Sequence, residues 1–437
     1  MTESKVMNRW LVVVGAVLIQ LALGAIYAWS VFTKKITLAL ADGGVYGFSA
    51  QQAAWIFSAG LASFAIVMVM AIRLQPILGP RRLAALGGIV LGVGYVLGGF
   101  LGKSFLAQLI CIGIIGGAGI GLGYVVPIAV GVKWFPDKKG LVSGLAVAGF
   151  GFGATIWVKL AGSWFGGLLN TTAVFGLPGV QSVFVIYGLV FAVLVLLGSI
   201  VMVNPPDGYV PAGWVPPEAT KTKTATGAVD LTPRAMLRTP QFYMLFLMFV
   251  GSALAGLMVI YCIRLFGIDA LQASGATADA ALAGTVAGTA MAWYAILNGL
   301  GRIAWGTVSD KLGRRLALFL MCLFQGVIML LFYKMGATSI GLIVGACIIG
   351  FNFGGNFALF PAATADFFGN KNVGQNYPLV FLAYGVAGIA GPQVAGVFKD
   401  AATGGEVTAW ITPFVIAGTA CLIAAVIGLC LKPPKHA

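Results

Sequence analysis

The sequence predicts an all-α membrane protein in which twelve transmembrane helices form two pseudo-symmetric six-helix halves. Of its 437 residues, 60% are hydrophobic and only 9% are charged, a balance far outside that of a soluble domain. Apolar runs of the roughly 20 residues that cross a bilayer occur twelve times along the chain. Landmarks in the two halves recur at a nearly constant spacing, which indicates a duplicated unit of the kind found in many secondary carriers.

Each apolar run is interpreted as one membrane span. The first run is taken as a span and not as a removable signal peptide, because no small-residue cleavage site and soluble domain follow it. The twelve runs lie at about 9–33, 51–72, 83–102, 105–132, 141–165, 181–203, 241–263, 283–306, 316–334, 338–363, 377–398 and 409–431.

The least hydrophobic segment, 204–240, separates the sixth run from the seventh. Its Pro, Thr and charged residues predict a cytoplasmic linker between an N-terminal half at 1–203 and a C-terminal half at 241–437. GPRR and GRR follow the second span of each half and begin 234 residues apart, while Phe135 and Phe368 follow the fourth spans and are 233 apart. These spacings support the duplication.

The 63 glycines indicate close helix packing. Runs at 113–124, 144–153 and 350–357 place small residues three or four apart, where helix backbones can approach each other. Because such runs occur in both halves, we expect hinge or sliding surfaces, with static packing as the alternative.

Basic residues are distributed unevenly between the two sides of the membrane. Both termini and the turns after the even-numbered spans contain 18 of the 26 Lys and Arg residues. Cytoplasmic loops carry this excess, so we expect both termini in the cytoplasm and the chain in a plasma membrane, the inner membrane of a prokaryote. The bias also accounts for the net charge of +14, so no nucleic-acid partner is expected.

Neither a metal nor a cofactor is expected. The six cysteines lie in or at the ends of apolar runs without CxxC spacing, as small hydrophobic residues do. The single histidine, His436, is in the tail, which excludes a histidine metal site or proton relay. An enzyme is excluded as well, because no nucleophile–base pair or phosphate loop falls at membrane depth.

Arg302 is the strongest candidate for a binding residue. It precedes Asp310, at the end of its span, by eight residues, or about 12 Å, and burial at that depth costs about 2.5–3.5 kcal/mol. All twelve Asp and Glu residues fall in loops or at helix ends. We therefore expect a carboxylate of the substrate to pair with Arg302, assisted by Asn298 one turn earlier. The alternative is an arginine that snorkels or bonds to backbone carbonyls.

The sequence GTVSDKLGRR at 306–315 matches the loop signature G-x-x-x-D-[KR]-x-G-[RK]-[RK] of the major facilitator superfamily, and the chain resembles that family. In the first half, IRLQPILGPRR keeps only the Gly and Arg end of the signature, with Pro76 in place of the acid. The resemblance implies a structural role for the loop residues, which are Gly306, Asp310, Lys311, Gly313, Arg314 and Arg315.

Longer segments resemble the oxalate/formate antiporter branch, which is related to the monocarboxylate transporters. They are LALGAIYAWSVF (21–32), KWFPDKKGLVSGLAVAGFGFG (133–153), RTPQFYML (238–245), ILNGLGRIAWGTVSDKLGRR (296–315) and FNFGGNFALFPAATADFFG (351–369). The resemblance implies the major facilitator fold, a midplane site and alternating access. It also places Arg302 where that family grips the substrate carboxylate.

One departure from the resemblance bears on the cargo. The oxalate carrier has a lysine after an N-Y-x(6) stretch, and NYPLVFLAY places Tyr384 at that position. One fixed positive charge leaves a dicarboxylate half neutralised, so we expect a small monocarboxylate of the lactate and pyruvate class.

Other polar and aromatic residues of the spans are candidates for lining the site. Packing between helices is the alternative for each of the tyrosines, and plain core for the phenylalanines. The candidates are Tyr27, Tyr124, Tyr384, Asn356, Phe353, Phe357 and Phe360. Lys159, at the outer end of the fifth span, is expected to snorkel, with anion recruitment as its alternative.

The expected function is secondary transport by a monomer, with protons as the coupling ion. No Asp, Glu or His lies at membrane depth, and Asn298 occupies the position of an Asp in the animal monocarboxylate carriers. The proton would be carried by the substrate itself or by the carboxylate of Asp310 or Asp366. Anion exchange is the alternative, and a carboxylate sensor or channel on the same fold is a further one.

Overall fold

The computed structural model describes residues 7–177, 179–206, 209–211, 230–369, 372–401, 406–432 and 434, apart from the side chains of 139–141 and 143. Over these residues the regular structure is helical and contains no strand. Within the same ranges, twelve helices are long and apolar enough to cross a membrane. The predicted fold class is therefore confirmed, and the chain is an integral membrane protein.

The first expected span, 9–33, is broken in the structure. The chain passes through a 3₁₀ segment at Gly24–Ala28, and Tyr27 lies in this break. The break separates α1 (Trp10–Leu23) from α2 (Trp29–Ile36). The next five spans are α3 (Ala50–Leu78), α4 (Pro80–Phe100), α5 with α6 (Phe105–Gln108 and Gly117–Trp134, joined by a π-helical stretch), α7 (Lys139–Gly162) and α9 (Gly179–Ser199). A short helix, α8 (Leu168–Thr171), lies between α7 and α9.

Several of the later helices extend beyond the ends of the apolar runs that predicted them. Runs expected to end at 263 and 306 continue as helix to Ala273 and Leu312, because backbone hydrogen bonding persists through polar residues beyond the hydrocarbon. These elements are α10 (Pro233–Met236), α11 (Pro240–Ala273), α12 (Ala280–Leu312), α13 (Arg314–Met335), α14 (Ser339–Phe368), α15 (Val373–Ala401) and α16 (Ile411–Cys430).

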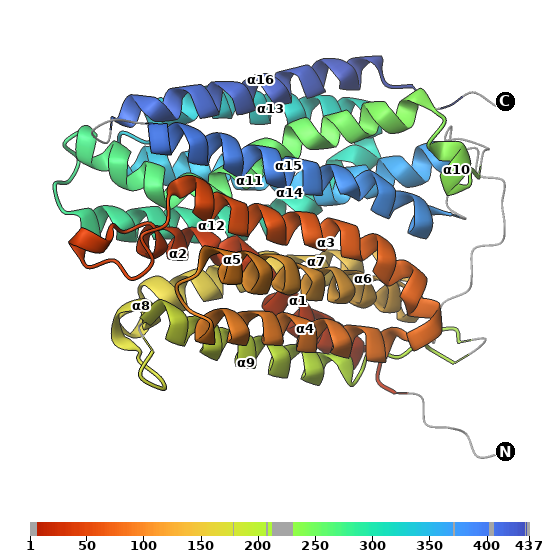
Figure 1. The fold of residues 1–437 in the computed structure, drawn as a ribbon. Coiled ribbons are helices and arrows are strands. Elements are labelled where there is room, and N and C mark those ends of the chain that lie inside the picture. The colour runs from red at the N-terminus through yellow and green to blue at the C-terminus, as the bar shows by residue number, and fades with distance from the viewer. Residues whose placement is uncertain are drawn as a thin grey trace.

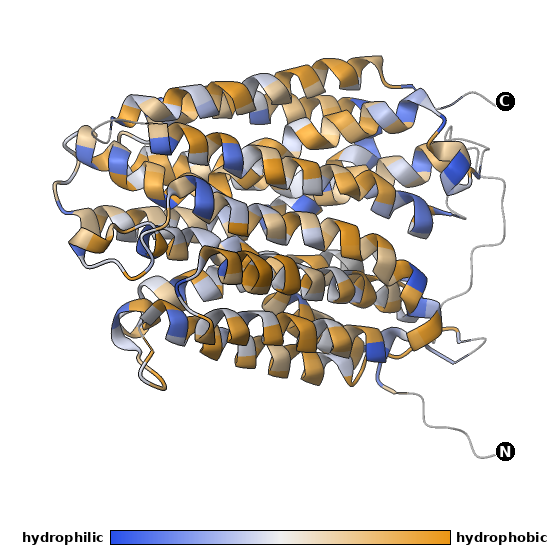
Figure 2. Cartoon of the chain, viewed as in Figure 1, coloured by the Kyte–Doolittle hydropathy of each residue, from blue (hydrophilic) through white to orange (hydrophobic). Residues whose placement is uncertain are grey.

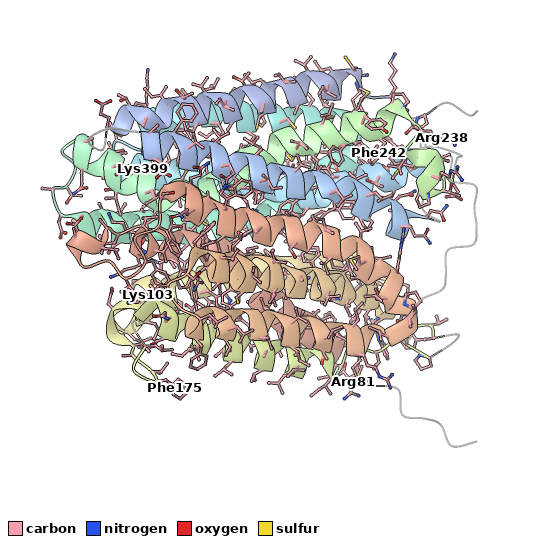
Figure 3. All side chains as sticks on the ribbon, in the orientation of Figure 1. Arg81, Lys103, Phe175, Arg238, Phe242 and Lys399 are labelled. Carbon is pink, nitrogen blue, oxygen red and sulfur yellow. The ribbon has the colours of Figure 1, made fainter. Side chains whose placement is uncertain are left out.

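The helices pack in two groups. Figure 1 shows α11 to α16 in one group and α1, α4, α6, α7 and α9 in the other, with α3 lying against α15 at the boundary. We call the end where the described chain begins and finishes the terminal end, and the other the opposite end. Hydrophilic residues gather at both ends and apolar residues between them (Figure 2). Arg81 and Arg238 lie at the terminal end, and Lys103 and Lys399 at the opposite end (Figure 3). Most of the expected linker, 204–240, lies outside the described residues.

Equivalent turns join α3 to α4 and α12 to α13. Gly79 has φ 76° and ψ 158°, and Gly313 has φ 82° and ψ 154°, a left-handed region that favours glycine. Ion pairs and hydrogen bonds between side chains stabilise the loop signature around the second turn. Arg314 contacts Asp310 and Asp366, each at 2.8 Å, and so ties α13 to α12 and α14.

The other signature residues lie around this ion-pair cluster. Arg315 donates to the Leu429 carbonyl oxygen, which links α13 to α16. Lys311 is exposed, and Gly306 packs near the side chain of Ala358. These contacts give the loop a structural part in joining helices of the same group.

Two seams of small residues join the helix groups. Along α7 and α12, the Thr155 hydroxyl donates to the Ala292 carbonyl oxygen at 3.1 Å, and Gly151 lies against the Ala295 carbonyl. Along α3 and α15, Gly388 packs on the Leu61 side chain. Small residues at such contacts let helix backbones approach closely.

At the opposite end, a carboxylate of α15 caps the N-terminus of α3 and so links the two helices of the second seam. The Asp400 carboxylate of α15 accepts hydrogen bonds from the backbone nitrogens of Ala50 and Gln51, both at 2.8 Å, at the start of α3. The Tyr261 hydroxyl donates to the Ala50 carbonyl oxygen. A carboxylate at a helix N-terminus is stabilising, so Asp400 holds the two groups together at this end.

We predict that Asp400→Asn loosens this closure about two- to fivefold, since such a helix–anion contact contributes about 0.3–1 kcal/mol. The measurement is the maleimide reaction rate of a cysteine placed at Thr37, which lines a cavity of about 340 Å³ beside Asp400, in a protein whose native cysteines are serines. Asp42→Asn, which alters an exposed acid at the same end, should leave the rate unchanged. Equal rates for the two variants would contradict the role of the cap.

Candidate functional site

Arg302 is buried in α12, ten residues before the helix ends at Leu312, and is held by neutral partners. Its exposed fraction is only 5%. Nε and Nη2 donate to the Asn298 side-chain oxygen at 3.1 and 2.9 Å, and Nη1 donates to the Val147 carbonyl oxygen of α7 at 3.2 Å. In the part of the chain that the structure describes, no carboxylate forms an ion pair with this guanidinium. Its positive charge is therefore uncompensated.

The packing of α14 on α12 fixes the arginine and its asparagine. A Cβ atom on Gly301 would lie 1.9 Å from the Phe351 carbonyl oxygen, and one on Gly354 would lie 2.1 Å from the Asn298 carbonyl oxygen. Real Cβ atoms do not approach so closely, so only glycine permits this contact. The two backbones press together at the level of Arg302, which limits how far its side chain can shift.

Aromatic rings surround the guanidinium. The Arg302 Cζ atom lies 4.1 Å from the ring centroid of Phe357 and 6.0 Å from that of Phe150. Phe353 meets Phe357 edge to face at 5.5 Å. Cation–π contacts are worth about 2 kcal/mol or more when desolvated, so these rings offset part of the cost of the buried charge.

Three of the predicted tyrosines join this cluster. The hydroxyls of Tyr27 and Tyr384 are hydrogen-bonded at 2.9 Å, which connects the break in the first span to α15. Tyr384 contacts the Phe357 ring at 5.6 Å. The Tyr124 hydroxyl is hydrogen-bonded to the Arg302 guanidinium and interacts with its charge. All three hydroxyls are therefore close enough to the guanidinium to interact with its charge.

Two predicted residues are not brought to Arg302. Asn356 accepts a hydrogen bond from the Ser252 hydroxyl at 2.8 Å, and Phe360 stacks on Phe249 with ring centroids 4.2 Å apart. Both pairs pack α14 against α11. Phe360 reaches the aromatic cluster only through Phe249, whose ring lies 6.4 Å from that of Tyr384.

Some residues of the site were not found from the sequence. They are Val147, Phe150, Phe64 and Phe381. Phe64 lies 5.8 Å from the Tyr384 ring, and Phe381 stacks on it at 4.8 Å. Apolar residues in apolar helices carry no signal of which ones face a particular arginine, so only tertiary contacts reveal them.

The arrangement provides donors for a planar anion. Asn298 and Val147 engage three of the five guanidinium N–H groups, and the Tyr124 hydroxyl is a further hydrogen-bond partner, so all the partners are neutral and one N–H group remains. The buried Asn298 Nδ2 also has no partner among the described residues. Two parallel N–H donors match the two oxygens of a carboxylate, while the surrounding rings suit a short apolar chain.

Comparison with known proteins gives consistent relatives. The chain matches the Major Facilitator Superfamily over residues 7–287 and 277–437. It is 30% identical to an uncharacterised MFS-type transporter, YhjX, of Escherichia coli, over 87% of this chain and 86% of that protein. It is 27% identical to the oxalate:formate antiporter of Oxalobacter formigenes (95% and 90%) and 25% identical to apicoplast pyruvate carrier 1 of Toxoplasma gondii (87% and 82%).

Solved structures share the fold. A bacterial homologue of the human lysosomal transporter Spinster, in an inward-facing unoccupied conformation, superimposes with a TM-score of 0.65 at 18% identity, over 97% of this chain and 96% of that one. The chain belongs to the major facilitator superfamily, and its relatives there include an oxalate:formate antiporter and monocarboxylate transporters.

Proposed function

We propose that this protein is a secondary active transporter that moves small monocarboxylates, of the lactate and pyruvate class, by alternating access with proton coupling. One observation carries the proposal: a buried arginine that has only neutral partners, and no carboxylate partner, among the described residues. The names of two relatives, an oxalate:formate antiporter and a pyruvate carrier, support the same class of cargo.

A substrate carboxylate supplies what the site lacks. A charged group at membrane depth costs about 2.5–3.5 kcal/mol, and neutral acceptors return only part of that. A bidentate carboxylate would take the free N–H group, displace one neutral partner such as the Tyr124 hydroxyl, and cancel the charge. Only Arg302 places a cation on the rings of Phe150 and Phe357 in the described chain, which favours cargo with a single negative charge.

We further propose that the terminal end faces the cytoplasm of a prokaryotic inner membrane and that the halves are 1–203 and 241–437, linked by 204–240. The excess of Lys and Arg in the loops of the terminal end supports this orientation. Among described residues, every hydrogen bond between the helix groups lies at the level of Arg302 or nearer the opposite end. In this orientation, the conformation is closed toward the outside. We also propose that a single chain carries out transport.

Two coupling modes fit the site. Three acids near the helix ends are engaged: Arg9 lowers the pKa of Asp137 by hydrogen bonding, and Arg314 pairs with Asp310 and Asp366. A proton would then travel mainly with the substrate. Anion exchange is the second candidate, because an empty site leaves Arg302 uncompensated and would reorient poorly.

We predict that Arg302→Ala lowers the affinity for pyruvate or lactate about 30-fold or more, since losing one partner of a buried charge pair costs about 2–5 kcal/mol. Arg302→Lys, which keeps the charge but not the fork, should retain part of the affinity. A thermal-shift titration with mono- and dicarboxylates measures both. Lys311→Ala, on the exposed end of the same helix, is the matched control. Unchanged ligand stabilisation in Arg302→Ala would overturn the proposed site.

We predict that an inwardly directed proton gradient accelerates uptake of labelled lactate into proteoliposomes, because each carboxylate would enter with a proton. Vesicles preloaded with formate or oxalate test exchange in the same assay. Uptake that ignores the gradient but requires a trapped anion would replace symport by exchange. Saturable binding without any uptake would indicate a sensor instead.

We predict that Tyr384→Lys shifts the preference toward oxalate over formate by about tenfold or more, corresponding to about 1.4 kcal/mol from a second fixed charge. Tyr384→Phe removes the hydroxyl bond to Tyr27 without adding charge and serves as the control. Competition against labelled substrate measures the ratio. A preference that does not differ between the two variants would contradict the charge argument.

A further inference from the structure

We infer that a second binding site for a small carboxylate lies between Arg302 and the opposite end, formed by Arg264 of α11, Lys159 of α7 and Thr289 of α12. It rests on the proposed function only for the choice of a carboxylate as ligand. The geometry of the cations stands independently of that choice. The site would hold the anion at one end of its path to or from Arg302.

Arg264 points from α11 toward the seam between α7 and α12. Its Nη1 lies 3.4 Å from where a Cβ atom on Gly162 would be, and its Nη2 lies 3.5 Å from the corresponding position on Gly284. Its Nε is fully buried and has no hydrogen-bond partner. No ion pair or hydrogen bond among the described residues involves this guanidinium. It is a second cation, half-buried, that has no anionic partner among the described residues.

Lys159 of α7 is a further cation, about one helical turn before the glycine that Arg264 approaches. Gly162 follows it by three residues on the same face of α7, so the lysine and the Arg264 guanidinium share that face. Nζ donates to the Thr289 hydroxyl at 2.9 Å, a neutral partner that leaves two ammonium hydrogens free.

The nearby acids are already engaged. Asp269 of α11 is paired with Lys399 at 2.5 Å and with the Trp410 indole at 2.8 Å. Asp279 accepts from the Ala281 backbone nitrogen at the start of α12, and Asp400 caps α3. Among the described residues no carboxylate forms an ion pair with Arg264 or Lys159, so an anion bound there would come from outside the chain.

The helix surface next to Thr289 is open. A Cβ atom on Gly288, adjacent to Thr289, would meet no atom within 4 Å. Arg264, Lys159 and Thr289 are all half-buried, so a small ion can reach them without unfolding a helix. Guanidinium and ammonium donors with a hydroxyl fit a carboxylate better than an uncharged solute.

The two cationic levels lie on one seam. Lys159 follows Val147, the α7 partner of Arg302, by twelve residues, which is about 18 Å along the helix. Thr289 precedes Arg302 on antiparallel α12 by a similar distance. A carboxylate leaving Arg302 toward the opposite end would therefore move along α7 and α12 to the second site, where Lys159 and Arg264 lie.

The test titrates the full chain, in lipid nanodiscs, with pyruvate by thermal shift at low and high salt. Arg302→Ala removes the central site, and the residual, weaker and salt-sensitive stabilisation should report the second one. Adding Arg264→Gln should weaken that component tenfold or more, and adding Arg264→Lys instead should retain part of it. Adding Lys103→Gln, an exposed lysine at the same end, should change nothing.

The outcomes separate the two proposals. If Arg302→Ala abolishes all saturable stabilisation, the second site is wrong while the proposed function stands. If the stabilisation that remains in Arg302→Ala is unchanged by adding Arg264→Gln, the second site is also contradicted, and the proposed function again stands. If Arg302→Ala binds pyruvate with wild-type affinity, it is the central site that fails. The comparison of Arg264→Lys with Arg264→Gln keeps the test valid should loss of the arginine weaken folding.

Discussion

The buried positive charge of Arg302, held only by neutral groups in the described chain, is the constraint on which the rest of the structure depends. A charge in a low-dielectric interior is costly unless it is paired, and an amide oxygen, a carbonyl and aromatic faces compensate it incompletely. The protein holds this unfavourable group in place with backbone contacts at Gly301 and Gly354 that admit no side chain. Such a preorganised and unsatisfied cation favours any planar anion that enters.

The same residues connect the two helix groups. Arg302 belongs to α12 and its carbonyl partner Val147 to α7, while the Tyr27–Tyr384 pair joins the broken first span to α15. A carboxylate that competes for Nη1 would therefore change a bond between the groups as well as a bond within the site. Alternating access requires a ligand to interact differently with two conformations, and this shared bond provides a physical means for that difference.

Charge is arranged differently at the ends and in the middle of the bundle. At the ends, acids are paired or cap helices, as Asp366, Asp269 and Asp400 do. Along the α7 and α12 seam, Arg302 and Lys159 have only neutral partners among the described residues. The ends are therefore held by internal ion pairs, while the interior keeps cations available for an anion that is not part of the chain.

Hydropathy and local spacing determined the twelve spans, the turn glycines at 79 and 313, and the pairing of Asn298 with Arg302, because each depends on neighbours within one helix. Only the tertiary structure decided which apolar residues face the arginine, since Val147, Phe150 and Phe64 look like any lipid-buried residue in the sequence. It also moved Asn356 and Phe360 to the α11 contact and placed Tyr27 in a helix break. Hydrophobicity specifies burial, whereas the packing of helices far apart in the chain specifies which face meets which.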